Sequence, residues 1–240
     1  MIRAIGFDLD GTLVNTAPDM ARAANAMLDL LGQAPLPERQ IPKLIGGGIA
    51  DFVERVLRTS TGDAATSPAL RAGAEALFRK LYRQRLFERS HVYPGVRQAL
   101  QTLASAGMPL CCITNKESAF AWPILQAAGL HGYFRYMLCA DLAEDRKPSP
   151  NLLIAACARL GVEPAHLLYV GDARTDIIAA RNAGCHVVAA TYGYRGLSEL
   201  DELHPDETID NLAEVTTYAS RRCSDTTLQR AKPLGSQLQS

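Results

Sequence analysis

The sequence predicts an α/β fold in which a parallel sheet carries helices on both faces and a helical cap domain is inserted into the core. Short apolar runs alternate with amphipathic stretches of helical length, a pattern typical of strands buried on both faces of a parallel sheet. About a hundred residues separate the first run from the second. One strand–helix–strand unit needs only ~30 residues, so the remainder is predicted to be an insertion.

Five apolar runs are predicted to form the sheet, each bounded by polar or glycine residues: 4–7, 110–113, 136–140, 167–170 and 187–190. Helical patterns lie between most of them. Three of these patterns end at a glycine, the residue that most often caps a helix C-terminus: 96–106, 148–160 and 175–183, followed by Gly107, Gly161 and Gly184. A regular order of strand, helix and strand predicts a five-stranded parallel sheet covered on both faces.

Residues 15–90 are predicted to be the helical cap, which leaves 1–14 and 91–219 for the core. The first cap helix is expected over about 18–31, and the second is expected to begin near Ile49. The third opens with Ser67 and Pro68, which suit the N-cap and first helical positions, and is expected to run to about residue 88. The polar stretch 220–240 is predicted to be a frayed tail.

The composition excludes several classes of function. The 25 basic and 25 acidic residues cancel, so no overall field draws the chain to nucleic acid or to a membrane surface. No apolar run approaches the ~20 residues of a membrane span, and the six cysteines show no C-x-x-C spacing. We therefore predict a reduced, cytoplasmic monomer or homodimer without nucleic-acid or membrane partners.

Polar residues gather where the predicted strands end. Ligands of open parallel sheets bind beyond the carboxyl ends of the strands, so side chains at these positions are expected to converge. Asp8 and Asp10 follow the first strand, and Lys147 precedes the helix after the third. The remaining members follow the second and fourth strands: Thr114, Asn115, Asp172 and Asp176.

This set of side chains suits phosphoryl transfer. Clustered carboxylates repel one another unless a hard cation neutralises them, and oxygen ligands around an open site suit Mg²⁺. A carboxylate can attack phosphorus and form an aspartyl-phosphate. Because Asp8 and Asp10 point to the same side of an extended segment, one can attack while the other handles the proton. Each residue alone also fits turn or capping chemistry, so the prediction depends on their joint occurrence.

Four segments resemble, in order and in spacing, the motifs of the haloacid dehalogenase superfamily. They are 7–14 (Phe-Asp-Leu-Asp-Gly-Thr-Leu-Val), 114–116 (Thr-Asn-Lys), 147–150 (Lys-Pro-Ser-Pro) and 171–176 (Gly-Asp-Ala-Arg-Thr-Asp). The resemblance covers residues 1 to about 215 and implies a three-layer, Rossmann-like core with a helical cap after the first strand. The D-x-D spacing implies a phosphatase, since dehalogenases of the family lack the second aspartate.

The resemblance also implies roles for the carboxylates. Asp8 resembles the family's nucleophile, and Asp10 resembles its general acid and base, which protonates the leaving oxygen and then activates water. Mg²⁺ is expected on the Asp8 side chain, on the Asp10 backbone carbonyl and on Asp172. Asp176 is expected to support the metal site from beside these ligands.

The phosphoryl group is expected to bind Thr114, Asn115 and Lys147, which match the family's phosphate ligands. One departure concerns the entry to the cap, where Asn15 stands at a position that relatives usually fill with aspartate. The nucleophile and the metal ligands are expected to be unaffected by it.

The substrate prediction depends on a second resemblance, to bacterial phosphoglycolate phosphatases, in residues 45–48, 183–185 and 191–194. The amides of Gly46, Gly47 and Gly48 precede a helix, so they could bind the carboxylate of 2-phosphoglycolate, although an ordinary turn explains them equally well. The expected substrate is therefore a small phosphorylated metabolite, 2-phosphoglycolate. Alternatives left open are a phosphatase for sugar phosphates or phospho-sugar acids, a phosphoglucomutase-like enzyme, and a binding module without turnover.

Overall fold

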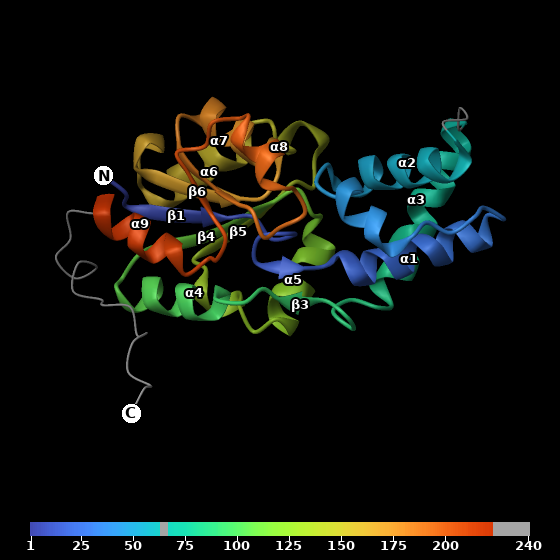
Figure 1. Cartoon of the computed structure of the whole chain (residues 1–240), viewed down its shortest axis with the longest axis horizontal. Helices are drawn as coiled ribbons and strands as arrows, with labels where there is room; N and C mark the ends of the chain where they lie inside the picture. Colours follow the sequence, from blue (N-terminus) through green and yellow to red (C-terminus); the bar gives the residue numbers. More distant parts are fainter. Residues whose placement is uncertain (63–66, 223–240) are drawn as a thin grey trace.

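A parallel sheet lies at the centre of the core, and the cap lies beside it (Figure 1). The structure is a computed structural model that describes residues 1–62 and 67–222. Within these residues the sheet has six strands in the order β5-β4-β1-β6-β7-β8, so β1 lies in the interior with β4 and β6 as its neighbours. The strands are β1 (Ala4–Phe7), β4 (Leu110–Thr114), β5 (Tyr136–Cys139), β6 (Leu167–Gly171), β7 (His186–Ala190) and β8 (Glu207–Ile209).

The five apolar runs all form strands, but the prediction of a five-stranded sheet is wrong by one strand. The sixth strand, β8, pairs in parallel with β7 at the sheet edge. It has three residues, Glu-Thr-Ile, and only Ile209 is buried. Because an edge strand of this length needs no apolar run, hydrophobic patterning does not mark it.

Helices cover both faces of the sheet, and each layer has its own apolar cluster. On one face lie α4 (Val96–Ser105), α5 (Ser118–Ala127) and α9 (Glu214–Arg222). On the other lie α6 (Asn151–Leu160), α7 (Arg174–Ala183) and α8 (Leu197–Asp201). Three short 3₁₀ turns lie in the connections: η2 (His131–Tyr133), which contacts α4 and α5, η3 (Ala143–Asp145) and η4 (Pro164–His166). None of the helices in the described ranges combines the length and apolar character needed to cross a bilayer.

Two boundaries differ from the sequence-based expectation. Helix α6 begins at Asn151 rather than at residue 148, so the Lys147-Pro148-Ser149-Pro150 segment is a turn ahead of it. Helix α9 continues through Arg222, three residues into the stretch predicted to be a tail. The rest of that stretch, 223–240, lies outside the described residues.

The cap consists of α1 (Ala17–Leu30), the 3₁₀ helix η1 (Glu38–Leu44), α2 (Gly48–Thr61) and α3 (Pro68–Arg83). An aromatic stack joins α2 to α3, with ring centroids of Phe52 and Phe78 5.1 Å apart and those of Phe78 and Tyr82 5.5 Å apart. Helix α3 ends at Arg83, five residues earlier than expected. The chain beyond it turns back toward α1 and the core.

The two connections between cap and core pair with each other. Strand β2 (Val14–Asn15) leads into the cap and runs antiparallel to β3 (His91–Val92), which leads out of it. Asn15 Oδ1 accepts a hydrogen bond from the backbone N–H of Ala17 at 3.2 Å. The carboxylate of an aspartate at this position would accept the same bond, so the departure at Asn15 leaves the start of α1 supported.

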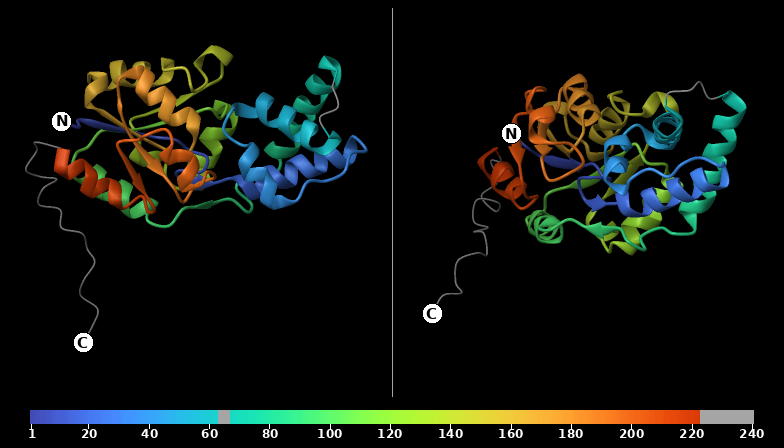
Figure 2. Two further views of the ribbon diagram at one scale, coloured as in Figure 1. Left: turned by 45° about the horizontal axis from the view of Figure 1, so that its top comes forward. Right: turned by 45° about the vertical axis from the view of Figure 1, so that its right-hand side comes forward.

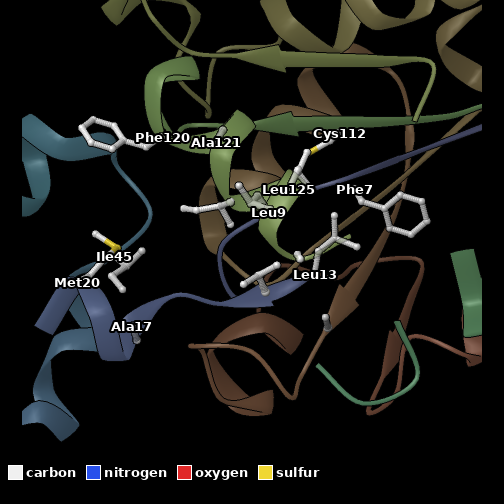
Figure 3. Packing of buried hydrophobic residues seen from close by; sticks show 14 of the residues in the cluster. Phe7, Leu9, Leu13, Ala17, Met20, Ile45, Cys112, Phe120, Ala121 and Leu125 are labelled. Atoms are coloured by element: carbon white, nitrogen blue, oxygen red, sulfur yellow. The ribbon is translucent and has the colours of Figure 1, made fainter. Parts of the chain in front are cut away.

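The cap lies beyond the carboxyl ends of the parallel strands in all three views (Figures 1 and 2). One continuous apolar cluster joins it to the core. In Figure 3, Leu9 and Leu13 from the core approach Met20 and Ile45 from the cap. The carboxyl edge of the sheet is therefore covered by a domain that the paired strands β2 and β3 connect to the core.

Asp19 on α1 holds the outgoing connection in place, and its removal should destabilise the protein. Its fully buried carboxylate accepts hydrogen bonds from Arg89 N (2.9 Å), from Ser90 N (2.8 Å) and from Ser90 Oγ (2.6 Å). Asp19→Ala leaves these donors buried and unpaired, so we expect the free energy of unfolding to fall by about 3 kcal/mol in urea titrations. The control is the exposed Asp29→Ala on the same helix, expected within about 0.5 kcal/mol of wild type; equal effects of the two substitutions would contradict this role.

Candidate active site

Three adjacent strands deliver the central residues of the site. Asp8 directly follows β1, Thr114 is the last residue of β4, and Asp172 directly follows β6. Since β4 and β6 flank β1 and all three are parallel, their carboxyl ends lie side by side. The chain crosses to opposite sides of β1 at this point, which is where open α/β sheets form their ligand sites.

Three buried carboxylates form a cluster that can hold a metal ion. Oxygens of Asp8, Asp172 and Asp176 all lie within 4.8 Å of one another. Burial raises the pKa of Asp8 to about 7, with Asp176 adding to the rise and Lys147 opposing it. Burial, together with the charges of Asp176 and Asp8, raises the pKa of Asp172 well above its usual range. Carboxylates held this close in a buried site favour a hard divalent cation among them.

Asp176 organises the cluster from its inner side. Its Oδ2 accepts hydrogen bonds from the backbone N–H groups of Asp172 (3.1 Å) and Ala173 (2.9 Å). Its Oδ1 accepts from Lys147 Nζ at 2.6 Å and from the Tyr169 hydroxyl at 3.4 Å. With both oxygens engaged, Asp176 orders the loop after β6, and Asp8 and Asp172 are left as the better cation ligands.

Lys147 balances the negative charge of the cluster. Its Nζ lies 2.8 Å from Asp8 Oδ1 and 2.6 Å from Asp176 Oδ1, and the side chain is buried. Burial alone would lower the pKa of Lys147, but the attraction of Asp176 and Asp8 outweighs it and raises the pKa above the usual range. The ammonium is therefore a fixed positive charge next to Asp8, the predicted nucleophile, in position to contact a phosphoryl group bound there.

The other two predicted phosphate ligands have different partners. Thr114 Oγ1 accepts a hydrogen bond from Lys116 N at 3.1 Å, and the hydroxyl hydrogen remains available to donate toward a phosphoryl oxygen. The Asn115 side chain bonds three backbone groups: Gly46 O (2.8 Å), Lys147 O (3.0 Å) and Lys147 N (2.7 Å). A contact of Asn115 with phosphate stays a prediction, and the structure gives it a further role in joining the cap loop to the Lys147 segment.

Asp10 lies two residues beyond Asp8 and pairs with Lys116. The two Asp10 oxygens are 2.9 and 3.0 Å from Lys116 Nζ, and the Thr16 hydroxyl donates to Oδ1. Lys116 is buried and its ammonium lies 5.1 Å from the centre of the Tyr82 ring. Sequence reasoning included Lys116 in the second motif but gave it no role; its position directly after Thr114 and Asn115 was the available signal.

A small pocket of about 30 Å³ lies between core and cap. The core lines it with Asp8, Asp10, Thr114, Asn115 and Lys116, and the cap lines it with Met20, Ile45, Gly46, Gly48, Ile49 and Phe52. Two of the three predicted loop glycines thus face the pocket. Gly47 faces the Asp51 carboxylate instead, since a Cβ added to Gly47 would lie 2.2 Å from Asp51 Oδ2.

Ion pairs and hydrogen bonds hold the cap closed over this pocket. Arg79 of α3 forms a two-pronged ion pair with Glu117 of the core, with its closest approach at 2.7 Å. On the other side of the pocket, Arg195 donates to the carbonyls of Lys43 (2.8 Å) and Ile45 (3.2 Å). Core residues thus contact the cap from two directions.

Residues 2–184 match the model of the haloacid dehalogenase-like hydrolase family, which is more than half of the chain, and the chain belongs to this family. It is therefore an enzyme of the hydrolase class. The predicted α/β, Rossmann-like fold is confirmed by solved structures of the same family. One of them, a crystal structure of a predicted phosphoglycolate phosphatase from Haemophilus somnus 129PT, has a TM-score of 0.85 at 32% identity over 91% of this chain and 98% of that chain.

Two curated relatives cover nearly the whole protein. The phosphoglycolate phosphatase of Nitrosospira multiformis is 42% identical over 215 residues, which are 90% of this chain and 94% of that protein. The phosphoglycolate phosphatase of Thiobacillus denitrificans is 42% identical over 221 residues, which are 92% of this chain and 96% of that protein. The similarity thus extends through both the core and the cap.

Divalent-cation binding at the carboxylate cluster should weaken as the pH falls. A carboxyl group with a pKa of about 7, as at Asp8, is mostly protonated at pH 6 and mostly ionised at pH 8, and the proton competes with the cation for the same oxygens. We expect Mg²⁺ to bind about tenfold more weakly at pH 6 than at pH 8 in calorimetric titrations. Asp172→Asn should weaken binding at both pH values, Asp29→Asn should leave it unchanged, and a pH-independent affinity would contradict the prediction.

Proposed function

We propose that this enzyme is a Mg²⁺-dependent phosphatase that carries its phosphoryl group on Asp8 and hydrolyses 2-phosphoglycolate to glycolate and phosphate. The observation that carries the proposal is the arrangement around Asp8, with Lys147 Nζ 2.8 Å from Oδ1 and Asp10 in the same pocket. A crystal structure of CbbY from Rhodobacter sphaeroides in complex with phosphate has the same fold, with a TM-score of 0.73 and 25% identity.

The proposed reaction has two steps. An oxygen of Asp8 attacks phosphorus while the bond from phosphorus to the leaving oxygen breaks, and Asp10 gives its proton to that oxygen. Asp10 then takes a proton from a water molecule that attacks the phosphorus of the aspartyl-phosphate, which releases phosphate and restores Asp8. Lys147 and Thr114 bind the phosphoryl oxygens, where charge is concentrated.

Mg²⁺ would be held by the side chains of Asp8 and Asp172 and by the backbone carbonyl of Asp10. The residues present fit such an ion: the donors are hard oxygens, and Asp8 Oδ1 is buried without an aligned hydrogen-bond donor. When bound, the ion neutralises the carboxylates and the incoming phosphoryl group. Asp176 would keep Asp172 and Lys147 in place beside it.

The pocket supports a small substrate. The cap side chains that line it are apolar (Met20, Ile45, Ile49 and Phe52), and the cap otherwise contributes glycines. A sugar would lose hydrogen bonds to water against such a wall without regaining them from the cap. The apolar lining therefore favours a two-carbon acid over the sugar-phosphate phosphatase and mutase alternatives, in agreement with the names of the relatives.

We also propose that the enzyme works in the cytoplasm. The five cysteines within the described ranges are free thiols, and four of them are buried. Unpaired cysteines are typical of proteins kept in a reducing compartment. Burial protects most of these thiols, and the pKa of Cys111, for example, is raised by burial to about 12, so the thiol stays uncharged and unreactive.

The substrate is tested by measuring phosphate release in the presence of Mg²⁺. We expect kcat/KM for 2-phosphoglycolate to exceed that for each member of a panel of sugar and nucleotide monophosphates by ~100-fold or more, equivalent to ~2.7 kcal/mol of differential transition-state binding. A sugar phosphate at the top of the panel would reject the proposed substrate and leave the Asp8 chemistry intact.

An aryl phosphate substrate distinguishes the role of Asp8 from that of Asp10. p-Nitrophenolate leaves without needing a proton, so Asp10→Asn should still be phosphorylated on Asp8 and then hydrolyse slowly. We expect a burst of p-nitrophenol close to one equivalent per enzyme for Asp10→Asn in stopped-flow absorbance, and none for Asp8→Asn. A burst from Asp8→Asn would show that another residue is the nucleophile.

A further inference from the structure

Lys116 is a buried cation that lines the pocket between core and cap, next to Asp10. Its ammonium contacts both oxygens of Asp10, at 2.9 and 3.0 Å. Nζ also lies 3.9 Å from Met20 Sδ and 5.1 Å from the centre of the Tyr82 ring. Among the described residues, Asp10 is the one carboxylate that forms an ion pair with Lys116. A second anion that entered the pocket would therefore find this ammonium with only one competing carboxylate.

The start of α2 is a weaker place for a substrate carboxylate. The loop of Gly46, Gly47 and Gly48 precedes this helix, whose N-terminus attracts negative charge. The protein's own Asp51 carboxylate already packs against Gly47 in the first turn of α2. A substrate carboxylate placed there would face the charge of Asp51, although Asp51 is partly balanced by Arg55 at 2.9 Å.

The geometry of the reaction brings a substrate carboxylate to Lys116. To donate its proton, Asp10 must lie within about 2.6–3.2 Å of the leaving oxygen. In 2-phosphoglycolate the carboxylate carbon is two bonds beyond that oxygen. A cation in direct contact with Asp10 is therefore within reach of the substrate carboxylate, and Lys116 lines the same pocket as Asp8 and Asp10.

We propose that Lys116 is the specificity-determining residue that binds the substrate carboxylate, exchanging its contact with Asp10 for one with the substrate. This inference rests on the proposed function, since it concerns the acid end of 2-phosphoglycolate. In the free enzyme Lys116 holds Asp10 from one side, and Thr16 holds it from the other. When the substrate carboxylate takes Lys116, Asp10 loses its counter-ion, takes up a proton from water and turns toward the leaving oxygen, to which it gives that proton. A phosphate ester without a neighbouring anion cannot make this exchange.

The test compares two substrates that differ at this end only: 2-phosphoglycolate and 2-hydroxyethyl phosphate, in which a hydroxymethyl group replaces the carboxylate. For the wild-type enzyme we expect a kcat/KM ratio of ~100 or more in favour of the acid. In Lys116→Met the ratio should fall below ~10, with the loss concentrated on 2-phosphoglycolate. Both substrates need Asp10, so any loss that acts through Asp10 cancels in the ratio.

Two further variants complete the design. Lys80→Met removes an exposed lysine of α3 and should leave both rates and their ratio unchanged. Lys116→Gln keeps a hydrogen-bond donor beside Asp10 while removing the charge, so it carries the test if the methionine variant does not fold; its ratio should also fall below ~10. Circular dichroism measures the folded fraction of each variant, so that a lower rate is not mistaken for a smaller amount of folded protein.

The outcomes separate the inference from the proposed function. A wild-type ratio near one would reject 2-phosphoglycolate as the substrate, and the inference with it. A high wild-type ratio that persists in both Lys116 variants would reject the role of Lys116 and leave the proposed function intact. Equal losses on both substrates would show that Lys116 acts by positioning Asp10 alone, which also overturns the inference.

Discussion

The ion pairs between Lys147 and the two aspartates Asp8 and Asp176 are the interactions on which the rest of the site depends. Three carboxylates within 4.8 Å of one another repel strongly in a buried environment, because little solvent is present to screen them. Lys147 contacts two of them, at 2.8 and 2.6 Å, and offsets part of that repulsion before any cation is bound. Burial, with a smaller contribution from the charge of Asp176, raises the pKa of Asp8 to about 7, and the repulsion that remains among the carboxylates favours binding of a divalent ion.

The fold holds Asp172 in the cluster because the backbone passes close to its side chain. Asp172 fits between two glycines: a Cβ added to Gly11 would lie 2.2 Å from Asp172 Oδ2, and one added to Gly193 would lie 2.4 Å from Asp172 Cβ. Gly11 also has a φ of 87°, a conformation that favours glycine. Tyr194, which follows Gly193, donates its backbone N–H to Asp172 Oδ2 at 2.7 Å. The Tyr194 hydroxyl accepts a hydrogen bond from Thr16 N at 2.8 Å, where the chain enters the cap. Tyr194 therefore contacts both the carboxylate cluster and the connection to the cap.

Much of the core could be predicted from the sequence because its signals are local. Buried parallel strands are short apolar runs, and helices such as α6 and α7 end at Gly161 and Gly184, both in the left-handed conformation. The convergence of Asp8 and Asp172 followed from strand ends meeting at one sheet edge. Strand β8 could not be predicted in this way, since three edge residues have no periodicity to detect.

The roles of Asn115 and Lys116 could not be predicted for a different reason. Both depend on partners far away in the sequence: Asn115 bonds the Gly46 carbonyl of the cap, and Lys116 pairs with Asp10, 106 residues earlier. A motif shows that a residue is near the site, but its partner is decided by how the cap closes. Lys147 lies with the carboxylates, as the positions of the strand ends predict, and its contact with a phosphoryl group stays a prediction.

Closure of the cap and recognition of the substrate use neighbouring residues of one segment. Thr114, Asn115, Lys116 and Glu117 are consecutive, and each has a different partner: Thr114 the proposed phosphoryl position, Asn115 the Gly46 carbonyl, Lys116 Asp10, and Glu117 Arg79 of α3. Two of these four contacts close the cap and two lie in the pocket. The segment joins the end of the central strand β4 to α5, so the charges that face the pocket belong to the core, while the apolar wall opposite them belongs to the cap. Under the proposed function, the closed cap limits the size of the leaving group, and the core side chains select its charge.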